Sequence, residues 1–115
     1  MSTKGRTDDL RQKRCKPCEG DAEPMSNAEA QEMLESVQGW ELQEKSITRT
    51  FEFKNFYRTM SFVNAVAWIA NREDHHPDLQ VGYGSCTVTL STHSIGGLSE
   101  NDFISAAKVN ALIED

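Results

Sequence analysis

The stretch "NFYRTMSFVNAVAWIANREDHHPDLQ", residues 55–80, decides the fold because a helix must end within it and a sheet must begin. Residues 55–72 repeat apolar side chains at helical spacing, which predicts a long helix. Pro77 disfavours helical geometry at the preceding residue, so the helix is expected to end near Asp74 or His75. The residues that follow are then expected to form a strand.

The apolar side chains of this helix predict both a core face and a contact surface. Phe62 and Ile69 fall on one flank of the expected core stripe, and Tyr57 and Trp68 fall on another. A helix with so many apolar sides usually covers a sheet and also meets a partner. We therefore expect a homodimer or a homotetramer. The core stripe itself is expected to contain Phe56, Met60, Val63, Val66, Ala67 and Ala70.

The segments on either side of the helix alternate apolar and polar side chains, which is typical of strands. Residues 40–53 predict a hairpin of two strands with a turn near Ser46. Residues 79–84 and 85–93 predict two further strands, separated by a turn that contains glycine. In the last of these strands the apolar side chains share one face, and His93 lies on the polar face at its end.

Two further helices are predicted from capping boxes. Ser26 with Glu29 begins a short helix that stops at Gly39, and Ser99 with Asp102 begins a last helix over residues 100–113. The expected order is therefore αββαββα. This order indicates the α+β class, with a four-stranded antiparallel sheet and three helices packed on one face.

The first 24 residues differ in composition from the rest of the chain. They are polar and poor in apolar side chains, so residues 1–24 are predicted to be a flexible arm and residues 25–115 a single domain. The arm carries Cys15 and Cys18 at C-x-x-C spacing. Zinc normally takes four ligands and the sequence offers no second pair, so we expect no metal site there.

Net charge and hydropathy exclude several classes of partner. The chain carries a net charge of −6, and its basic residues are concentrated near the N-terminus. The acidic domain would repel a phosphate backbone, so nucleic-acid binding is not expected. The sequence has no apolar run long enough to span a membrane. Together with three cysteines, an odd number, this favours a cytoplasmic protein without structural disulfides.

The chain's three histidines are the candidates for chemistry. His75 and His76 lie at the corner between the long helix and a strand, and His93 follows eighteen residues later at the end of the next strand. Pairing of the two strands could bring all three rings to one pocket. Imidazole can give and take a proton near neutral pH, so such a pocket suits a reaction that moves protons both ways, such as a dehydration.

Structural roles compete with these functional ones. The His-His-Pro run could serve only to stop the helix. Asp102 has a role as the capping partner of Ser99, and its carboxylate lies at the positive end of the last helix. Trp40 is expected to be half buried, with its indole N–H near the margin of a site.

The segment "EDHHPDLQVGYGSCTVTLSTHSIGGLSENDF", residues 73–103, resembles the signature of the pterin-4a-carbinolamine dehydratases. The resemblance extends over about residues 26–113. Asn71 departs from the family pattern, which usually has glutamate at this position. The residues at matching spacing are His75, His76, Pro77, Tyr83, His93 and Asp102.

The resemblance implies an αββαββα fold and a hydro-lyase activity. The family converts 4a-hydroxytetrahydropterin to quinonoid dihydropterin and water, and so recycles the cofactor of aromatic amino-acid hydroxylases. It also implies homo-oligomers, and it requires neither a metal nor an organic cofactor.

The same resemblance assigns roles to site residues. His75 and His93 are expected to act as the acid and base, and His76 to bind the substrate and polarise its hydroxyl group. We expect Trp40 to flank the pterin ring. The other substrate-binding candidates are Ser91 and Thr92, through backbone groups, and Asp102.

Two alternatives to this assignment remain open from the sequence. His75, His93 and Asp102 could form a two-histidine, one-carboxylate iron site. The chain could also be a non-enzymatic binding or dimerisation module that keeps the same fold.

Overall fold

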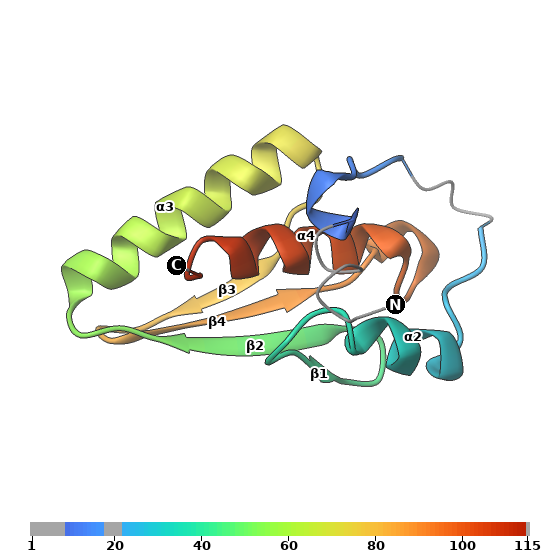
Figure 1. Cartoon of the computed structure of the whole chain (residues 1–115), viewed down its shortest axis with the longest axis horizontal. Helices are drawn as coiled ribbons and strands as arrows, with labels where there is room; N and C mark the ends of the chain where they lie inside the picture. The colour runs from blue at the N-terminus through green and yellow to red at the C-terminus, as the bar shows by residue number, and fades with distance from the viewer. Residues whose placement is uncertain (1–8, 18–21, 115) are drawn as a thin grey trace.

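The structure is a computed structural model that describes residues 9–17 and 22–114. It contains one four-stranded antiparallel sheet in the order β1-β2-β4-β3, and α3 and α4 lie over one face of it (Figure 1). The predicted α+β class and antiparallel sheet are confirmed. The elements are α2 (Asn27–Leu34), β1 (Glu41–Leu42), β2 (Ile47–Glu52), α3 (Phe56–Glu73), β3 (Asp78–Val81), β4 (Ser85–Leu90), the 3-10 helix η1 (His93–Ile95) and α4 (Glu100–Ala111).

The central strand pair sorts apolar from polar side chains. β2 and β4 pair over their full lengths, from Ile47 opposite Leu90 to Glu52 opposite Ser85. On the face away from the helices, the paired threonine hydroxyls of Thr50 and Thr87 lie 2.8 Å apart. The helix-covered face is apolar, as the alternation predicted, apart from Arg49, whose guanidinium lies over the Phe51 ring and donates to Oδ1 of Asn110 in α4 at 2.8 Å. The buried apolar members of this face are Ile47, Phe51, Cys86, Val88 and Leu90.

The buried face of α3 is rotated from the one predicted. Only Val66 and Ala70 of the six expected core positions are buried, and Phe56 is 49% exposed. Phe62 fixes the rotation because its ring packs on those of Phe51 and Phe53, at centroid distances of 4.7 and 5.0 Å. The buried positions on α3 are Thr59, Phe62, Val66, Ile69, Ala70 and Glu73.

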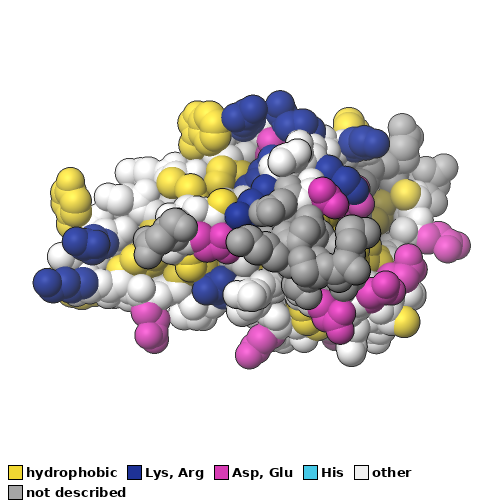
Figure 2. All heavy atoms as spheres, in the orientation of Figure 1, with side chains coloured by type: hydrophobic (Ala, Val, Ile, Leu, Met, Phe, Trp, Pro, Cys, Tyr) yellow, Lys and Arg dark blue, Asp and Glu magenta, His cyan; other side chains and the backbone are white. Residues whose placement is uncertain are grey.

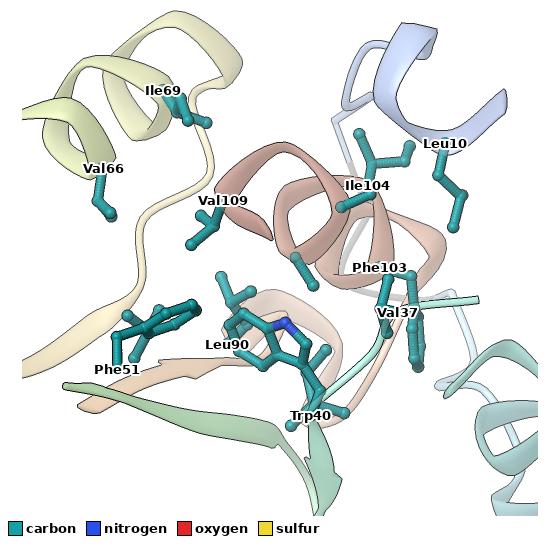
Figure 3. Close-up of a cluster of buried hydrophobic side chains, with 14 of the residues drawn as sticks. Leu10, Val37, Trp40, Phe51, Val66, Ile69, Leu90, Phe103, Ile104 and Val109 are labelled. Atoms are coloured by element: carbon teal, nitrogen blue, oxygen red, sulfur yellow. The ribbon is translucent and has the colours of Figure 1, made fainter. Parts of the chain in front are cut away.

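Helix α4 is the centre of the core. Most of its residues are buried, because it lies between the sheet and segments packed on its other side. In Figure 3, Phe103 and Val109 point into the same cluster as Leu90 and Trp40. The Trp40 ring meets Phe51 edge-on at 6.1 Å.

The N-terminal segment packs against α4, although residues 1–24 were predicted to form a flexible arm. Residues 9–12 are helical, and Leu10 is only 4% exposed, beside Ile104 (Figure 3). The Lys108 ammonium donates to the Arg11 carbonyl at 2.7 Å. We call residues 10–17 the N-terminal strap. Cys18, the second cysteine of the C-x-x-C, lies outside the described residues.

Within residues 9–17 and 22–114, no helix is long and apolar enough to cross a membrane. In the same residues, no group of three His, Cys, Asp or Glu side chains is arranged to hold a metal ion. The geometry therefore gives no support to the iron site drawn from His75, His93 and Asp102.

Candidate active site

A cavity of about 450 Å³ lies where α3 ends, and we call it the histidine pocket. His75, His76 and His93 all line it, so the structure brings the three histidines together. Ser91 and Thr92, two of the predicted substrate-binding residues, line it as well. Three residues of the N-terminal strap also line this cavity: Cys15, Lys16 and Pro17.

The end of α3 directs the histidines into this pocket. The helix ends at Glu73, and Asp74 adopts a left-handed conformation with φ 52° and ψ 43°. Non-glycine residues rarely adopt this conformation, and aspartate is among those that tolerate it best. The next backbone N–H, that of His75, still donates to the Ala70 carbonyl at 3.2 Å. The chain therefore leaves the helix within one residue, close to the position predicted from Pro77.

His75 forms a pair with a buried carboxylate. Its Nε2 lies 2.6 Å from Oδ1 of Asp102, whose exposed fraction is 0%. A carboxylate can only accept, so Nε2 carries the proton and Nδ1 is the accepting nitrogen of the neutral ring. The other carboxylate oxygen accepts from the Thr92 hydroxyl at 2.9 Å and from the Ser99 backbone N–H at 3.0 Å. Asp102 is therefore beneath His75 rather than on the pocket surface.

His76 and His93 are exposed on the pocket rim. Nε2 of His76 lies 3.2 Å from Oδ1 of Asn71, the residue that departs from the family pattern. His93 was predicted to end a strand, but β4 stops at Leu90 and His93 begins η1 instead. The backbone N–H of Thr92 donates to the Gly97 carbonyl at 2.8 Å, which turns the chain out of the sheet before His93.

Trp40 is not part of the pocket. Its ring is buried, and its indole N–H donates to Oδ1 of Asn110 at 2.8 Å. Asn110 is near the C-terminal end of α4, whereas Asp102 is in its first turn, roughly 12 Å away along the helix. The indole N–H therefore finds its partner in the core, and Trp40 does not lie where it could flank a pterin ring in this pocket.

The residues that hold the strap against the pocket were not among those predicted from the sequence. Glu73 has a buried side chain, and Asn101 is buried in the first turn of α4. Cys15 is half buried, with its Sγ 3.6 Å from the Ser105 hydroxyl, and burial raises the pKa of its thiol to about 11. The correct rotation of α3 would have found Glu73, since this residue continues the buried stripe of Val66, Ile69 and Ala70.

A second cavity, of about 520 Å³, lies between the strap, α3 and α4. In Figure 2, Lys and Arg side chains gather over the end of α3 in this region. None of the three histidines lines it, so proton-transfer chemistry points to the histidine pocket instead. The basic residues that line it are Arg11, Arg14, Arg72 and Lys108.

The α+β fold and the histidine pocket define a small domain with a carboxylate-supported imidazole site. The family model for pterin 4 alpha carbinolamine dehydratase matches residues 23–112, and the chain therefore belongs to that family. A protein of Nitrosomonas eutropha that carries the name pterin-4-alpha-carbinolamine dehydratase is 58% identical over 106 residues, or 91% of this chain and 94% of its own. A Stenotrophomonas maltophilia protein of the same name is 55% identical over 107 residues, or 91% and 92%. These names are those of a lyase.

Solved structures agree with this family. A transcriptional coactivator/pterin dehydratase from Brucella melitensis superposes with a TM-score of 0.76 at 35% identity, over 79% of this chain and 99% of that one. A pterin dehydratase-like protein described as a RuBisCO assembly factor of the alpha-carboxysome has a TM-score of 0.54 at 24% identity, over 64% and 84%. The second likeness concerns the fold alone. The strap lies before the first residue that the family model matches.

Proposed function

We propose that this chain dehydrates 4a-hydroxytetrahydropterin to quinonoid dihydropterin, releasing water. The observation that carries the proposal is the pairing of His75 with the buried Asp102 on a cavity that His76 and His93 also line. A volume of about 450 Å³ lies within the range of small-molecule sites. Family membership supplies the substrate class.

The reaction needs one proton given and one proton taken. The C4a–O bond breaks as the hydroxyl group accepts a proton and leaves as water, N5 loses its proton, and a C4a=N5 double bond forms. We assign these two transfers to His75 and His93, in an order set by which face of the ring carries the hydroxyl. Positioned acid–base groups of this kind contribute roughly 10²- to 10⁴-fold in rate.

Asp102 supports this chemistry through His75. Its carboxylate fixes the proton on Nε2, leaves Nδ1 as the base, and stabilises the charged ring that forms when Nδ1 accepts a proton. His76 is proposed to bind the substrate and polarise its hydroxyl group. Backbone groups of Ser91 and Thr92 are proposed to meet the amide edge of the pterin.

A dehydratase assay on 4a-hydroxytetrahydropterin tests the proposal. The purified chain should accelerate formation of the quinonoid product above the spontaneous rate, and His75→Ala should remove most of that acceleration. The control is Asp78→Asn, an exposed change on β3 outside the pocket, which should keep the full acceleration. A rate no faster than the spontaneous one would overturn the proposal.

The wider role follows from the same proposal. Quinonoid dihydropterin is the form that a reductase can return to tetrahydropterin, so the chain would serve an aromatic amino-acid hydroxylase. A homo-oligomeric state and a cytoplasmic location remain predictions. The exposed rings of Tyr57 and Trp68 on α3 support self-association.

A binding or dimerisation module is the competing function. The structural neighbour described as an assembly factor has a related fold, so this fold also occurs in a protein with a non-enzymatic description. The His75–Asp102 pair favours the enzyme. Capping of α4 uses Oδ2 of Asp102, and a protein that only binds a partner has no need of the contact between Oδ1 and a pocket imidazole.

A further inference from the structure

The N-terminal strap is docked beside the pocket through its backbone. The Lys16 N–H donates to Oδ1 of Asn101 at 2.9 Å, and Nδ2 of Asn101 donates to the Lys16 carbonyl at 2.6 Å. One side-chain amide thus satisfies both backbone groups of Lys16, as a neighbouring strand would. Lys16 and Pro17, the residues docked in this way, both line the histidine pocket.

A buried carboxylate anchors the residues just before. Oε1 of Glu73 accepts from the Cys15 backbone N–H at 2.8 Å, and Oε2 lies 2.9 Å from Nε of Arg14. Lys108 is the second nearby cation, at 4.0 Å. The Glu73 side chain is only 1% exposed, so removing its partners would leave a charge without compensation. The strap is therefore held at two points.

Both anchors are chain neighbours of the proposed catalytic pair. Glu73 precedes His75 by two residues across the turn at Asp74, and Asn101 directly precedes Asp102. The backbone segments that place His75 and Asp102 therefore also place the strap. The strap and the His75 imidazole line the same cavity.

We propose that residues 15–17 form a substrate-contacting wall of the histidine pocket, held there by Glu73 and Asn101 as positioning residues. The Lys16 ammonium is a hydrogen-bond donor suited to the ring carbonyl or side-chain hydroxyl oxygens of a pterin. This inference rests on the proposed function, and it assigns the strap to substrate affinity rather than proton transfer. The wall lies outside the residues that the family model matches.

The direct test compares two lysines of the same strap. Lys16→Ala should raise KM about tenfold, the change expected on loss of one charge-assisted hydrogen bond, and should change kcat by less than about twofold. Lys13→Ala is the matched control, because Lys13 does not line the histidine pocket and forms an exposed ion pair with Glu100 at 3.1 Å. Its KM should match that of the unchanged protein. Equal KM values for all three proteins would overturn the proposal that residues 15–17 contact the substrate.

Asn101→Ala tests the positioning role. It removes both contacts to the Lys16 backbone, so KM should rise by a similar factor and Cys15 should react faster with iodoacetamide. A merely structural role would give a different result, namely a lower kcat from a smaller folded fraction with KM unchanged. That result would overturn the positioning role.

A binding measurement separates this inference from the proposed reaction. Fluorescence titration with 7,8-dihydrobiopterin, which lacks the 4a-hydroxyl group, reports binding without turnover. Weaker binding to Lys16→Ala and Asn101→Ala would uphold the wall even if no dehydration were detected. Binding that is the same in all variants, or absent from all of them, would overturn the wall whatever the activity.

Discussion

His75 and Asp102 stand 27 residues apart in the chain, and their side chains meet at 2.6 Å. The two carboxylate oxygens of Asp102 have different partners. Oδ1 contacts the imidazole, and Oδ2 accepts from the backbone N–H of Ser99 in the capping box of α4. In the sequence, helix capping and a direct functional role were alternatives for this residue. In the structure one carboxylate both caps α4 and contacts the imidazole.

Asp102→Asn should separate these two duties. The amide oxygen can still accept from Ser99, but the amide nitrogen would then face the Nε2–H of His75, and two donors cannot bond to each other. The ring would lose its fixed tautomer, and kcat should fall by at least roughly 10²-fold. Steady-state kinetics measure this fall, with a thermal melt to confirm the fold.

The matched control for that variant is Asp78→Asn on β3, whose side chain is exposed. It should keep normal turnover. Full activity in Asp102→Asn would show that His75 does not act through a fixed tautomer. It would favour the alternative in which the His-His-Pro run serves only to stop the helix.

His93→Ala and His76→Ala should affect different kinetic constants. His93→Ala removes a proposed proton-transfer group and should lower kcat, whereas His76→Ala should mainly raise KM. The combined loss in a His75→Ala, His93→Ala double variant should be smaller than the product of the single losses, because groups that act together are not additive. A double variant whose loss of turnover equals the product of the two single losses would contradict this prediction.

Much of the fold was predictable because it depends on local pattern. The alternation in β2 and β4, the two capping boxes and the stop at Pro77 are each set by neighbouring residues, and the structure contains all of them. The rotation of α3 was not predictable in the same way. Tyr57, Trp68 and Phe56 make almost every side of this helix apolar, and only contact with the sheet through Phe62 selects one side.

The candidate site was also predictable only in part. The three histidines could be brought together from the sequence, because pairing of two successive strands places the end of the second strand, near His93, beside the start of the first, near His75 and His76. The strap could not be placed, because a single leucine in a polar segment, Leu10, carries most of its apolar burial. Several of its other contacts involve backbone atoms, such as those between Asn101 and Lys16, and these leave no pattern in the sequence.

Leu10→Ala should therefore destabilise the whole domain. Removing a buried leucine at the edge of a core costs about 2 kcal/mol or more of unfolding free energy. Urea unfolding should show a lower midpoint with an unchanged slope. Lys13→Ala, a neighbouring exposed change, should leave the midpoint in place. A midpoint unaffected by Leu10→Ala would show that Leu10 is not packed on the core in solution, in agreement with the flexible arm predicted from the sequence.

The Cys15 thiol should report on strap docking through pH. Burial raises its pKa from 9.0 to about 11, an effect opposed by the hydrogen bond with Ser105 and reinforced by Glu73. The folded protein thus holds this proton more tightly than the unfolded chain does. The resulting stability is present below pH 9 and is lost as pH rises through about 11.

Alkylation at pH 8.5, mapped to individual cysteines by mass spectrometry, measures this effect. Cys15 should react far more slowly in the folded protein than in urea, since the thiolate is the reactive form. Equal rates in the two states would show that the strap is undocked in solution.

Assembly should depend on the outer side of α3. Tyr57 and Trp68 are 80% and 61% exposed, whereas Ile69, which the sequence placed on a flank, is buried in the core of this chain. Sedimentation velocity should show an oligomer, and Tyr57→Ser with Trp68→Ser should shift it towards smaller species. Ser61→Ala, an exposed change on the same helix, is the control. A wild-type monomer at micromolar concentration would contradict the prediction.

The left-handed turn at Asp74 has a consequence for how the pocket can evolve. Glu73, Asp74, His75 and His76 are consecutive, and three of them contact separate partners: the strap, Asp102 and Asn71. One residue inserted in the last turn of α3 would rotate Glu73 by about 100° about the helix axis and break the alignment of all three. The corner can therefore accept changes of side chain far more readily than an insertion or a deletion, and homologues that alter the pocket should keep the spacing from Ala70 to Pro77.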